Sequence, residues 1–378
     1  MRMVPLKACI LAVATLCACV CAQAQGTVQV YGRVDGGVDI TRAGKSGWQK
    51  RVISSGLNGS RVGFTGSEDL GDGLSAIFRI VMGLNLDDGT LAQGGRGFGR
   101  ESIVGLSSRK LGTVQFGRVE TPAYRAHITV DAFQFGTAGA AEITRSAATS
   151  SGQLMPLGNN ARVDNSISYI SPQLAGFTTY GLVAAGEGSA QIGRAYDVSV
   201  RYQNGPIDAI AEVGQQNGAG NASSNGKVTS TLVGGSYDFK VAKVLAAYTI
   251  EKNSCTTCTG TLARMPGVTG TNTSEFRLAQ VGVRVPVGAA ILIAQYIRVD
   301  DRSQYAVPTG NRDTNWFAVG SEYYLSKRTL IYATVGTLTN HNGSLYALGT
   351  GSAQQPANTV GPNDPRTTTM SLGINHSF

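Results

Sequence analysis

The sequence predicts an all-β protein, a sixteen-stranded antiparallel transmembrane β-barrel, and three features of the chain support that fold class. Apolar and polar residues alternate in segments of roughly ten residues, which is the length of a tilted membrane strand. The connections between these segments alternate between short and long. The last segment ends on an aromatic residue at the carboxyl terminus, where a closed barrel pairs its final strand with its first.

Alternation identifies the strands because successive side chains of a β-strand point to opposite faces of the sheet. In residues 27–40, Val30, Val34 and Val38 share one face, whereas Arg33 and Asp35 lie on the other. The same pattern recurs along the chain. The predicted strands are residues 27–40, 60–67, 74–85, 100–108, 112–119, 163–171, 176–186, 194–203, 206–215, 228–239, 243–252, 274–285, 289–300, 313–325, 329–338 and 367–378.

The two faces of these strands are expected to contact two different solvents. A bilayer core offers no hydrogen-bond partner to a bare backbone, so a spanning sheet must close on itself. The apolar face then contacts lipid and the polar face contacts water. Sixteen strands enclose a lumen that is too wide for side chains to fill, so the barrel is expected to form a channel.

The lengths of the connections set the expected orientation. Bacterial membrane barrels have short periplasmic turns and long extracellular loops. With both termini on the periplasmic side, residues 120–162 form the third outer loop. The short connections include 68–73, 204–206 and 326–328, and the long ones are 41–59, 86–99, 120–162, 253–273 and 339–366.

The amino-terminal segment has the features of a secretory signal. Arg2 and Lys7 precede an uncharged run over residues 8–22, and residues 22–24 read Ala-Gln-Ala, as at a cleavage site. We therefore expect a signal peptide over residues 1–24 and a barrel domain over residues 25–378. A lipoprotein cleavage site near residues 16–19 is a weaker alternative, because its cysteine pattern is atypical.

The charge balance argues for an anionic permeant rather than a nucleic acid. The chain carries 32 basic and 24 acidic residues. Nucleic-acid binding calls for Lys and Arg clustered on one element, whereas these charges are scattered along the strands. Basic side chains on the inner face would give the lumen a positive potential, which attracts anions.

Cys255 and Cys258 are the cysteines of the expected mature chain, because the other four lie within the predicted signal. Their Cys-x-x-Cys spacing also occurs in redox and zinc sites, but no second ligand pair accompanies it. A small loop disulfide in an oxidising compartment is the favoured interpretation.

A series of short motifs supports this fold along the whole mature chain. They are residues 28–32 (Val-Gln-Val-Tyr-Gly), 59–64 (Gly-Ser-Arg-Val-Gly-Phe), 66–71 (Gly-Ser-Glu-Asp-Leu-Gly), 104–108 (Val-Gly-Leu-Ser-Ser), 112–118 (Gly-Thr-Val-Gln-Phe-Gly-Arg), 165–169 (Asn-Ser-Ile-Ser-Tyr), 325–329 (Leu-Ser-Lys-Arg-Thr) and 373–378 (Gly-Ile-Asn-His-Ser-Phe). In their order and number they resemble the trimeric general porins of Gram-negative outer membranes, most closely the anion-selective beta-proteobacterial branch.

The resemblance implies a location, partners and a pore geometry. It implies a homotrimer in the outer membrane, in contact with membrane lipid and lipopolysaccharide. It also implies that the barrel-assembly machinery recognises the carboxyl-terminal Phe378. The third loop, residues 120–162, would fold into the lumen and narrow it.

The resemblance also places an arginine cluster at Arg61, Arg100 and Arg162. Alternation directs Arg61 and Arg162 inward, whereas it directs Arg100 toward lipid or a neighbouring subunit unless a bulge turns it. In the family the third strand often carries an inward glutamate where this chain has Val81. That departure would make the constriction more positive.

Four further arginines, Arg33, Arg79, Arg118 and Arg201, could extend the cluster into an electrostatic ladder for anions. The alternative is that inward arginines pair with acids on neighbouring strands. The acids that could serve as these partners are Asp35, Asp39, Asp197 and Asp208. In the third loop, Asp131, Glu142 and Arg145 either face the arginines or form a solvated surface.

The favoured function is passive diffusion of small hydrophilic solutes and ions, with a preference for anions. The alternatives are a substrate-specific channel and a surface barrel that acts as an adhesin or receptor. Catalysis is not expected, because His127, His341 and His376 are the only histidines and none has a triad pattern. The sequence predicts neither a cofactor nor a metal site.

Overall fold

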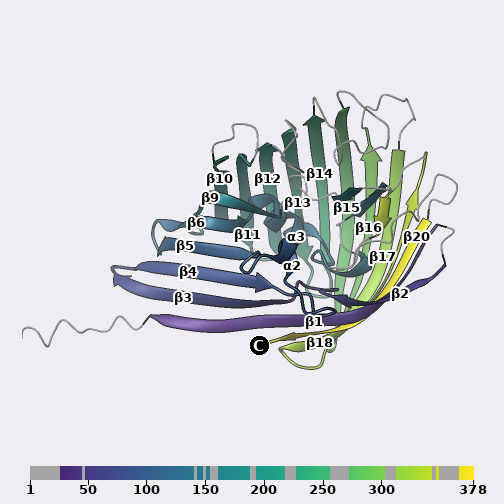
Figure 1. The fold of residues 1–378 in the computed structure, drawn as a ribbon, viewed down its shortest axis with the longest axis horizontal. Helices are drawn as coiled ribbons and strands as arrows, with labels where there is room; N and C mark the ends of the chain where they lie inside the picture. The colour runs from purple at the N-terminus through teal and green to yellow at the C-terminus, as the bar shows by residue number, and fades with distance from the viewer. Residues whose placement is uncertain are drawn as a thin grey trace, which may run out of the picture.

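The computed structural model describes residues 26–44, 47–139, 143–147, 150–153, 161–187, 193–217, 227–255, 272–302, 312–342, 346–348 and 366–378. The predicted signal peptide lies outside these ranges. Within them, sixteen antiparallel strands form a closed barrel, so the predicted fold class is confirmed (Figure 1). No helix in the described ranges is long and apolar enough to cross a membrane.

Each barrel strand pairs with its neighbours in chain order, and every strand predicted from the sequence is present. The barrel strands are β1 (Thr27–Ala43), β3 (Arg61–Gly71), β4 (Leu74–Gly83), β5 (Glu101–Ser108), β6 (Gly112–Glu120), β9 (Arg162–Ile170), β10 (Phe177–Ala184), β11 (Ala195–Asn204), β12 (Ile207–Asn217), β13 (Lys227–Asp238), β14 (Lys243–Cys255), β15 (Asn272–Val287), β16 (Ala290–Asp301), β17 (Arg312–Tyr324), β18 (Thr329–Asn340) and β20 (Arg366–Ser377).

The two ends of the chain close the barrel. Strand β20 pairs with β1 from Arg33 opposite Ser377 to Ala43 opposite Thr367. Figure 1 shows the purple β1 and the yellow β20 lying side by side. Beyond the strand, Gly32 and Phe378 exchange two backbone hydrogen bonds of 3.1 and 3.0 Å. The aromatic terminus therefore completes the pairing of the last strand with the first.

The alternation read from the sequence separates an exposed apolar face from a buried polar face. On β11, Val198 and Val200 are exposed, whereas Asp197 and Ser199 between them are buried. On β20, Leu372 and Ile374 are exposed, whereas Ser371 and Asn375 are buried. The exposed face is apolar because it is the outer surface of a barrel that contacts lipid.

The outer connections contain elements that the alternation did not predict. Strand β2 (Gln49–Ser54) folds back and pairs with the outer half of β1. It occupies the position next to β1 that β3 leaves open, because β3 pairs with β1 only as far as Arg61. A small second sheet joins β7 (Ile143–Ala147), β8 (Ser150–Gln153) and β19 (Tyr346–Leu348), and thus links the third outer connection to the last.

Candidate functional site

The connection after β6 carries a helix, α3 (Pro122–Val130), that packs on the inner face of the wall. Thr121 caps the helix, since its hydroxyl accepts a hydrogen bond of 3.1 Å from the Tyr124 amide, and Pro122 occupies the first turn. The Ala123 amide donates to Asp197 Oδ2 of β11 at 2.9 Å. Figure 1 shows α3 within the curve of the sheet.

The apolar side of α3 fixes the helix against β12, β13 and β14. Ala126 and Val130 form a buried cluster with Ile210, Leu232 and Ala247, whose side chains point inward from those strands. This cluster buries apolar surface inside the lumen, which is unusual for a water-filled barrel. The burial holds the helix against the wall.

The segment that follows α3 is held by polar side chains of the opposite strands. Gln295 of β16 accepts from the Ala132 amide at 2.7 Å and donates to Asp131 Oδ1 at 2.9 Å. Trp316 of β17 donates its indole N–H to the Ala138 carbonyl at 3.1 Å. The short 3-10 helix η1 (Thr137–Gly139) ends the described part of this segment. Residues 121–139 thus run along the inner wall from β11 to β18.

A tight turn over residues 55–60 supports this segment from the other side. Asp35 of β1 accepts hydrogen bonds from the Asn58 amide at 3.0 Å and from the Leu57 amide at 3.3 Å. The Gly56 carbonyl in turn accepts from the Thr137 amide at 2.5 Å. Hydrogen bonds therefore run without a break from Asp35 in the wall, through the turn, to Thr137 in the inward segment.

Beside this turn lies a hollow of about 430 Å³, which we name the arginine hollow. Its charged lining consists of Arg33, Arg61, Arg79, Arg100, Arg125, Glu101 and Glu120. Five arginines against two glutamates leave a formal excess of three positive charges. An excess of one sign in a narrow aqueous space concentrates counter-ions of the other sign.

The two glutamates neutralise part of this cluster. Arg79 forms a bidentate ion pair with Glu101, at 2.7 and 2.8 Å. Glu120 accepts from Arg162 at 2.7 Å and also lies 3.8 Å from Arg125 and 3.9 Å from Arg100. Arg61 forms no ion pair with any side chain that the structure describes. Arg33 forms none either, so Arg61 and Arg33 are the two arginines of the hollow without an ion pair among the described residues.

Arg100 lies in the arginine hollow, although alternation predicts that it faces lipid. The chain bends at Arg100, and β5 begins only at Glu101, so alternation along β5 does not extend to it. Arg100 is 8% exposed, and its guanidinium lies over Gly59, where an added Cβ would meet Nη1 at 2.4 Å. Burial and the nearby Arg162 and Arg61 lower the pKa of Arg100 to about 10, so it stays charged.

A second hollow of about 590 Å³ lies toward the outer ends of the strands, and we name it the outer hollow. Its charged lining consists of Arg96, Arg118 and Arg162, together with Asp164 and Glu187. Asp164 accepts from Arg118 at 2.6 Å and from Arg96 at 2.8 Å. Arg162 borders this hollow while its partner Glu120 borders the arginine hollow, so the two spaces are adjacent.

The remaining predicted site residues are distributed differently. Arg33 lies in the arginine hollow, where it donates to Ser377 and Asn58. Arg201 pairs with Asp208 at 2.6 Å and lines neither hollow. Among the described residues, Arg201 is the one predicted pore arginine that pairs with an acid proposed from the sequence. Asp39 pairs instead with Arg51 of β2, at 2.6 Å.

Asp131 lines neither the arginine hollow nor the outer hollow. It ends α3 and is bound to Gln295 and to the Phe133 amide, on the β16 side of the lumen. Glu142 and Cys258 lie outside the described residues. Arg145 lies within β7 and Cys255 ends β14, but the structure describes neither side chain.

Sequence reasoning missed the two glutamates and Arg125. The signal for Glu101 was present, because it shares a face with the inward Ile103 and opposes the outward Val104. By register Glu101 lies directly opposite Val81, so the wall keeps a carboxylate although Val81 is apolar. Arg125 had no such signal, since its position follows from the inward course of α3.

Comparisons with known proteins agree with this geometry. A family model described as Gram-negative porin matches residues 8–343. An outer membrane porin protein of Bordetella pertussis is 30% identical, over 94% of this chain and 96% of that protein. Outer membrane porin protein 32 of Delftia acidovorans is 29% identical, over 99% of this chain and all of that protein.

Solved structures show the same barrel. The anion-selective porin from Comamonas acidovorans superposes with a TM-score of 0.77 at 27% identity, over 94% of this chain and all of that one. A trimer form of OmpT from Vibrio cholerae shares the fold, with a TM-score of 0.67 at 17% identity. The closed sixteen-stranded barrel, its inward segment and its sequence relatives together place this chain in the Gram-negative porin family, as a channel protein of the outer membrane.

Proposed function

We propose that this porin passes small hydrophilic solutes by passive diffusion and prefers anions. The observation that carries the preference is the formal excess of three positive charges in the arginine hollow. The similarity to the anion-selective porin from Comamonas acidovorans supports the same proposal. The channel has no catalytic role in this proposal, because charged side chains act on the permeant only through the potential they create.

Residues 120–162 are proposed to form the constriction loop. Its helix α3 carries Arg125 to the arginine hollow, so loop and wall contribute charge to the same space. Arg61, Arg79, Arg100 and Arg33 supply the wall charge there. Arg118 and Arg162 are proposed to attract anions at the outer hollow before they reach the constriction. Arg201, which Asp208 neutralises, is proposed to contribute little.

Several other features of the proposal extend beyond the pore. The protein is proposed to be exported by a signal peptide over residues 1–24 and to form a homotrimer. Phe378 is proposed to be the residue that the barrel-assembly machinery recognises, and lipopolysaccharide to contact the outer surface. Cys255 and Cys258 are proposed to form a loop disulfide. Glu142 and Arg145 are proposed to add loop charge near the pore.

Planar bilayers test the channel and its selectivity separately. Purified protein is expected to insert in discrete conductance steps. In a potassium chloride gradient, the reversal potential is expected to have the sign of chloride preference. Absence of steps would overturn the channel, whereas steps with cation preference would overturn only the role of the arginine hollow.

A further inference from the structure

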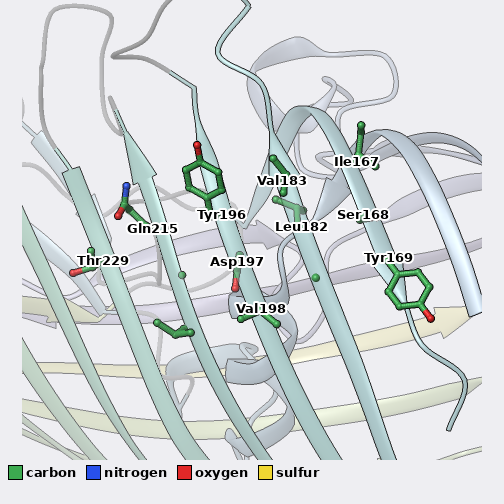
Figure 2. A pocket seen from close by; sticks show the side chains of 13 residues that line it. Ile167, Ser168, Tyr169, Leu182, Val183, Tyr196, Asp197, Val198, Gln215 and Thr229 are labelled. Carbon is green, nitrogen blue, oxygen red and sulfur yellow. The ribbon is translucent and has the colours of Figure 1, made fainter.

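Two buried carboxyl groups lie together on the inner side of β11 and β12, next to the start of helix α3. Asp197 of β11 pairs by register with Gly214 of β12, and Glu212 precedes that glycine by two residues. Asp197 is 4% exposed and Glu212 is 3% exposed. Figure 2 shows Asp197 between Tyr196 and Val198, whose side chains are exposed on the outer face of the same strand. Asp197 therefore points into the barrel, away from the membrane.

The absence of a side chain at Gly214 lets the two carboxyl groups approach each other. The position that a Cβ on Gly214 would occupy lies 2.9 Å from Glu212 Oε1 and 3.2 Å from Asp197 Oδ1. Both oxygens are buried, and neither has a hydrogen-bond donor among the described residues. Two buried oxygens that only accept hydrogen bonds repel each other and leave the cost of their desolvation uncompensated. One proton between them would supply the missing donor.

No basic side chain in the described part of the chain neutralises this pair. Neither Asp197 nor Glu212 forms an ion pair there, although Asp197 is one of the acids that the sequence offered as a partner for an arginine. On α3, Arg125 lines the arginine hollow and His127 is buried. On β14, Glu251 lies across β13 from Gly214. Two neighbouring buried carboxyl groups without a cation cannot both ionise at low cost, so one of them keeps its proton.

The surroundings of the two groups decide which one keeps the proton. Asp197 Oδ2 accepts a hydrogen bond of 2.9 Å from the Ala123 amide, in the first turn of α3. A helix N-terminus favours a negative charge at that position. Glu212 Oε2 accepts a hydrogen bond of 3.2 Å from the neutral hydroxyl of Ser230. The ionised member is therefore Asp197, and the protonated member is Glu212.

We propose that Glu212 is a neutral carboxylic acid at neutral pH and donates a hydrogen bond from Oε1 to Asp197 Oδ1. This bond fixes the carboxylate of Asp197, which in turn holds the first turn of α3. Because α3 carries Arg125 to the arginine hollow, Glu212 is a positioning residue for the constriction and adds no charge to it. The consequence for the pore rests on the proposed constriction loop, whereas the proton itself is detected without measuring a current.

Infrared spectroscopy of the purified protein at neutral pH tests the proton directly. The spectrum of the wild type minus that of Glu212→Gln is expected to contain the carbonyl absorption of a protonated carboxyl group, which shifts in heavy water. Glu120→Gln is the matched control, because Glu120 lies among Arg162, Arg125 and Arg100 and should lose only carboxylate bands. Loss of carboxylate bands alone in Glu212→Gln would overturn the proposal, whether the pair is fully ionised or holds a metal cation instead of a proton.

Reversal potentials in planar bilayers test the charge of Glu212 by a second route. Glu120→Gln removes a negative charge from the constriction and should raise the anion preference. Glu212→Gln replaces one neutral group with another, so its reversal potential should equal that of the wild type. A rise in anion preference as large as that of Glu120→Gln would show that Glu212 is ionised and would overturn the proposal.

Current noise in the same recordings tests the positioning role. In Glu212→Gln the amide nitrogen can still donate to Asp197 and the amide oxygen can still accept from Ser230, so the currents should stay as quiet as those of the wild type. Glu212→Leu has no donor and should give noisier currents, which Glu212→Gln does not. Equal noise in the wild type and Glu212→Leu would overturn the positioning role. Absence of any conductance steps would overturn the channel proposal instead, and the infrared spectra would still decide the position of the proton.

Discussion

The Tyr332 hydroxyl donates a hydrogen bond of 2.9 Å to Asp35 Oδ1 and thereby joins β18 to β1 across the intervening β20. Asn375 of β20 donates to the other oxygen of Asp35 at 2.6 Å. The same carboxylate accepts the amides of Leu57 and Asn58. One buried side chain therefore ties together the closing strands of the barrel and the turn that supports the inward segment.

Replacing Asp35 is expected to loosen both the barrel closure and the inward segment. In Asp35→Asn, one carboxylate oxygen becomes an amide that cannot accept, so one set of buried donors loses its partner. Losing a hydrogen bond to a buried charged group costs about 2 kcal/mol. We expect thermal unfolding at a lower temperature and noisier single-channel currents. Asp39→Asn is the control, since Asp39 pairs with Arg51 of β2, whereas Asp35 binds the amides of the turn. Equal current noise in the two variants would show that the turn does not support the constriction.

Arg61→Gln is expected to weaken the anion preference more than any paired arginine does. Its charge has no ion-pair partner among the described residues, so it acts on the permeant without compensation. A unit charge about 4 Å from an ion in water is worth about 1 kcal/mol, which corresponds to a change of about fivefold in the permeability ratio. The reversal potential in a salt gradient measures this ratio. Arg201→Gln is the control, because Asp208 already neutralises Arg201. An equal shift in both variants would contradict the role given to Arg61.

Glu120→Gln is expected to change selectivity in the opposite direction. The carboxylate lies between the guanidinium groups of Arg162, Arg125 and Arg100 and offsets part of their charge. Removing it raises the net charge of the constriction by one, so the anion preference should increase. Reversal potentials measured with Glu275→Gln provide the control, since Glu275 lies on the outward face among basic residues. A decrease in anion preference for Glu120→Gln would mean that Glu120 acts mainly by positioning the arginines.

The sequence predicted the strands of the barrel wall far better than the arrangement of the residues inside the lumen. Alternation located all sixteen barrel strands because the exposed face of each must be apolar throughout. It also directed Arg61 and Arg162 to the side of the wall where the structure places them. It did not predict β2. Residues 49–54 pair with one neighbour, β1, and lipid does not require them to present an apolar face.

The arrangement of the side chains inside the lumen depends on contacts between residues far apart in the sequence. The sequence left open whether Asp131 faces the arginines or solvent, and Gln295 of β16 binds it in the structure. The position of Arg125 depends on how α3 packs against β12 and β13, which no local pattern specifies. Arg100 illustrates the limit at strand ends, where a bend of one residue reverses the direction that alternation assigns.

His127 gives the inward segment a dependence on pH. His127 is a buried residue of α3, and its ring stacks against Phe135. Its ring nitrogen Nε2 has no hydrogen-bond partner in the described part of the chain. Burial lowers the pKa of His127 to about 3. A base with a lowered pKa binds fewer protons in the packed state, so that state is fully stable above the ordinary value of 6.5 and loses stability as the pH falls below it. At pH 4.5 the expected loss is on the order of 3 kcal/mol.

Single-channel recordings at pH 7 and pH 4.5 measure this effect. Wild-type currents are expected to become noisier at the lower pH, because α3 separates from β12, β13 and β14 more often. His127→Gln removes the titrating group and should respond less to pH. His341→Gln is the control, since His341 is exposed at the outer end of β18. The assignment fails if His127→Gln keeps the full acid response of the wild type.

Gly32 and Phe378 provide a test of barrel closure. Gly32 shares the outward face of β1 with Val30 and Val34, and the ring of Phe378 covers it. A Cβ on Gly32 would lie 2.3 Å from the Phe378 ring and 2.8 Å from the Arg61 carbonyl. The carbonyl cannot move without breaking the β1–β3 ladder, so Gly32→Ala should displace the ring and strain the two backbone hydrogen bonds that end β20. We expect slower refolding in detergent and a lower yield of heat-resistant barrel on gels.

Phe378→Ala removes the ring and should relieve the clash with it, so the double variant should refold better than Gly32→Ala alone. If the double variant refolds no better, the defect of Gly32→Ala arises at the Arg61 carbonyl, and the ring plays no part in sealing the last strand to the first.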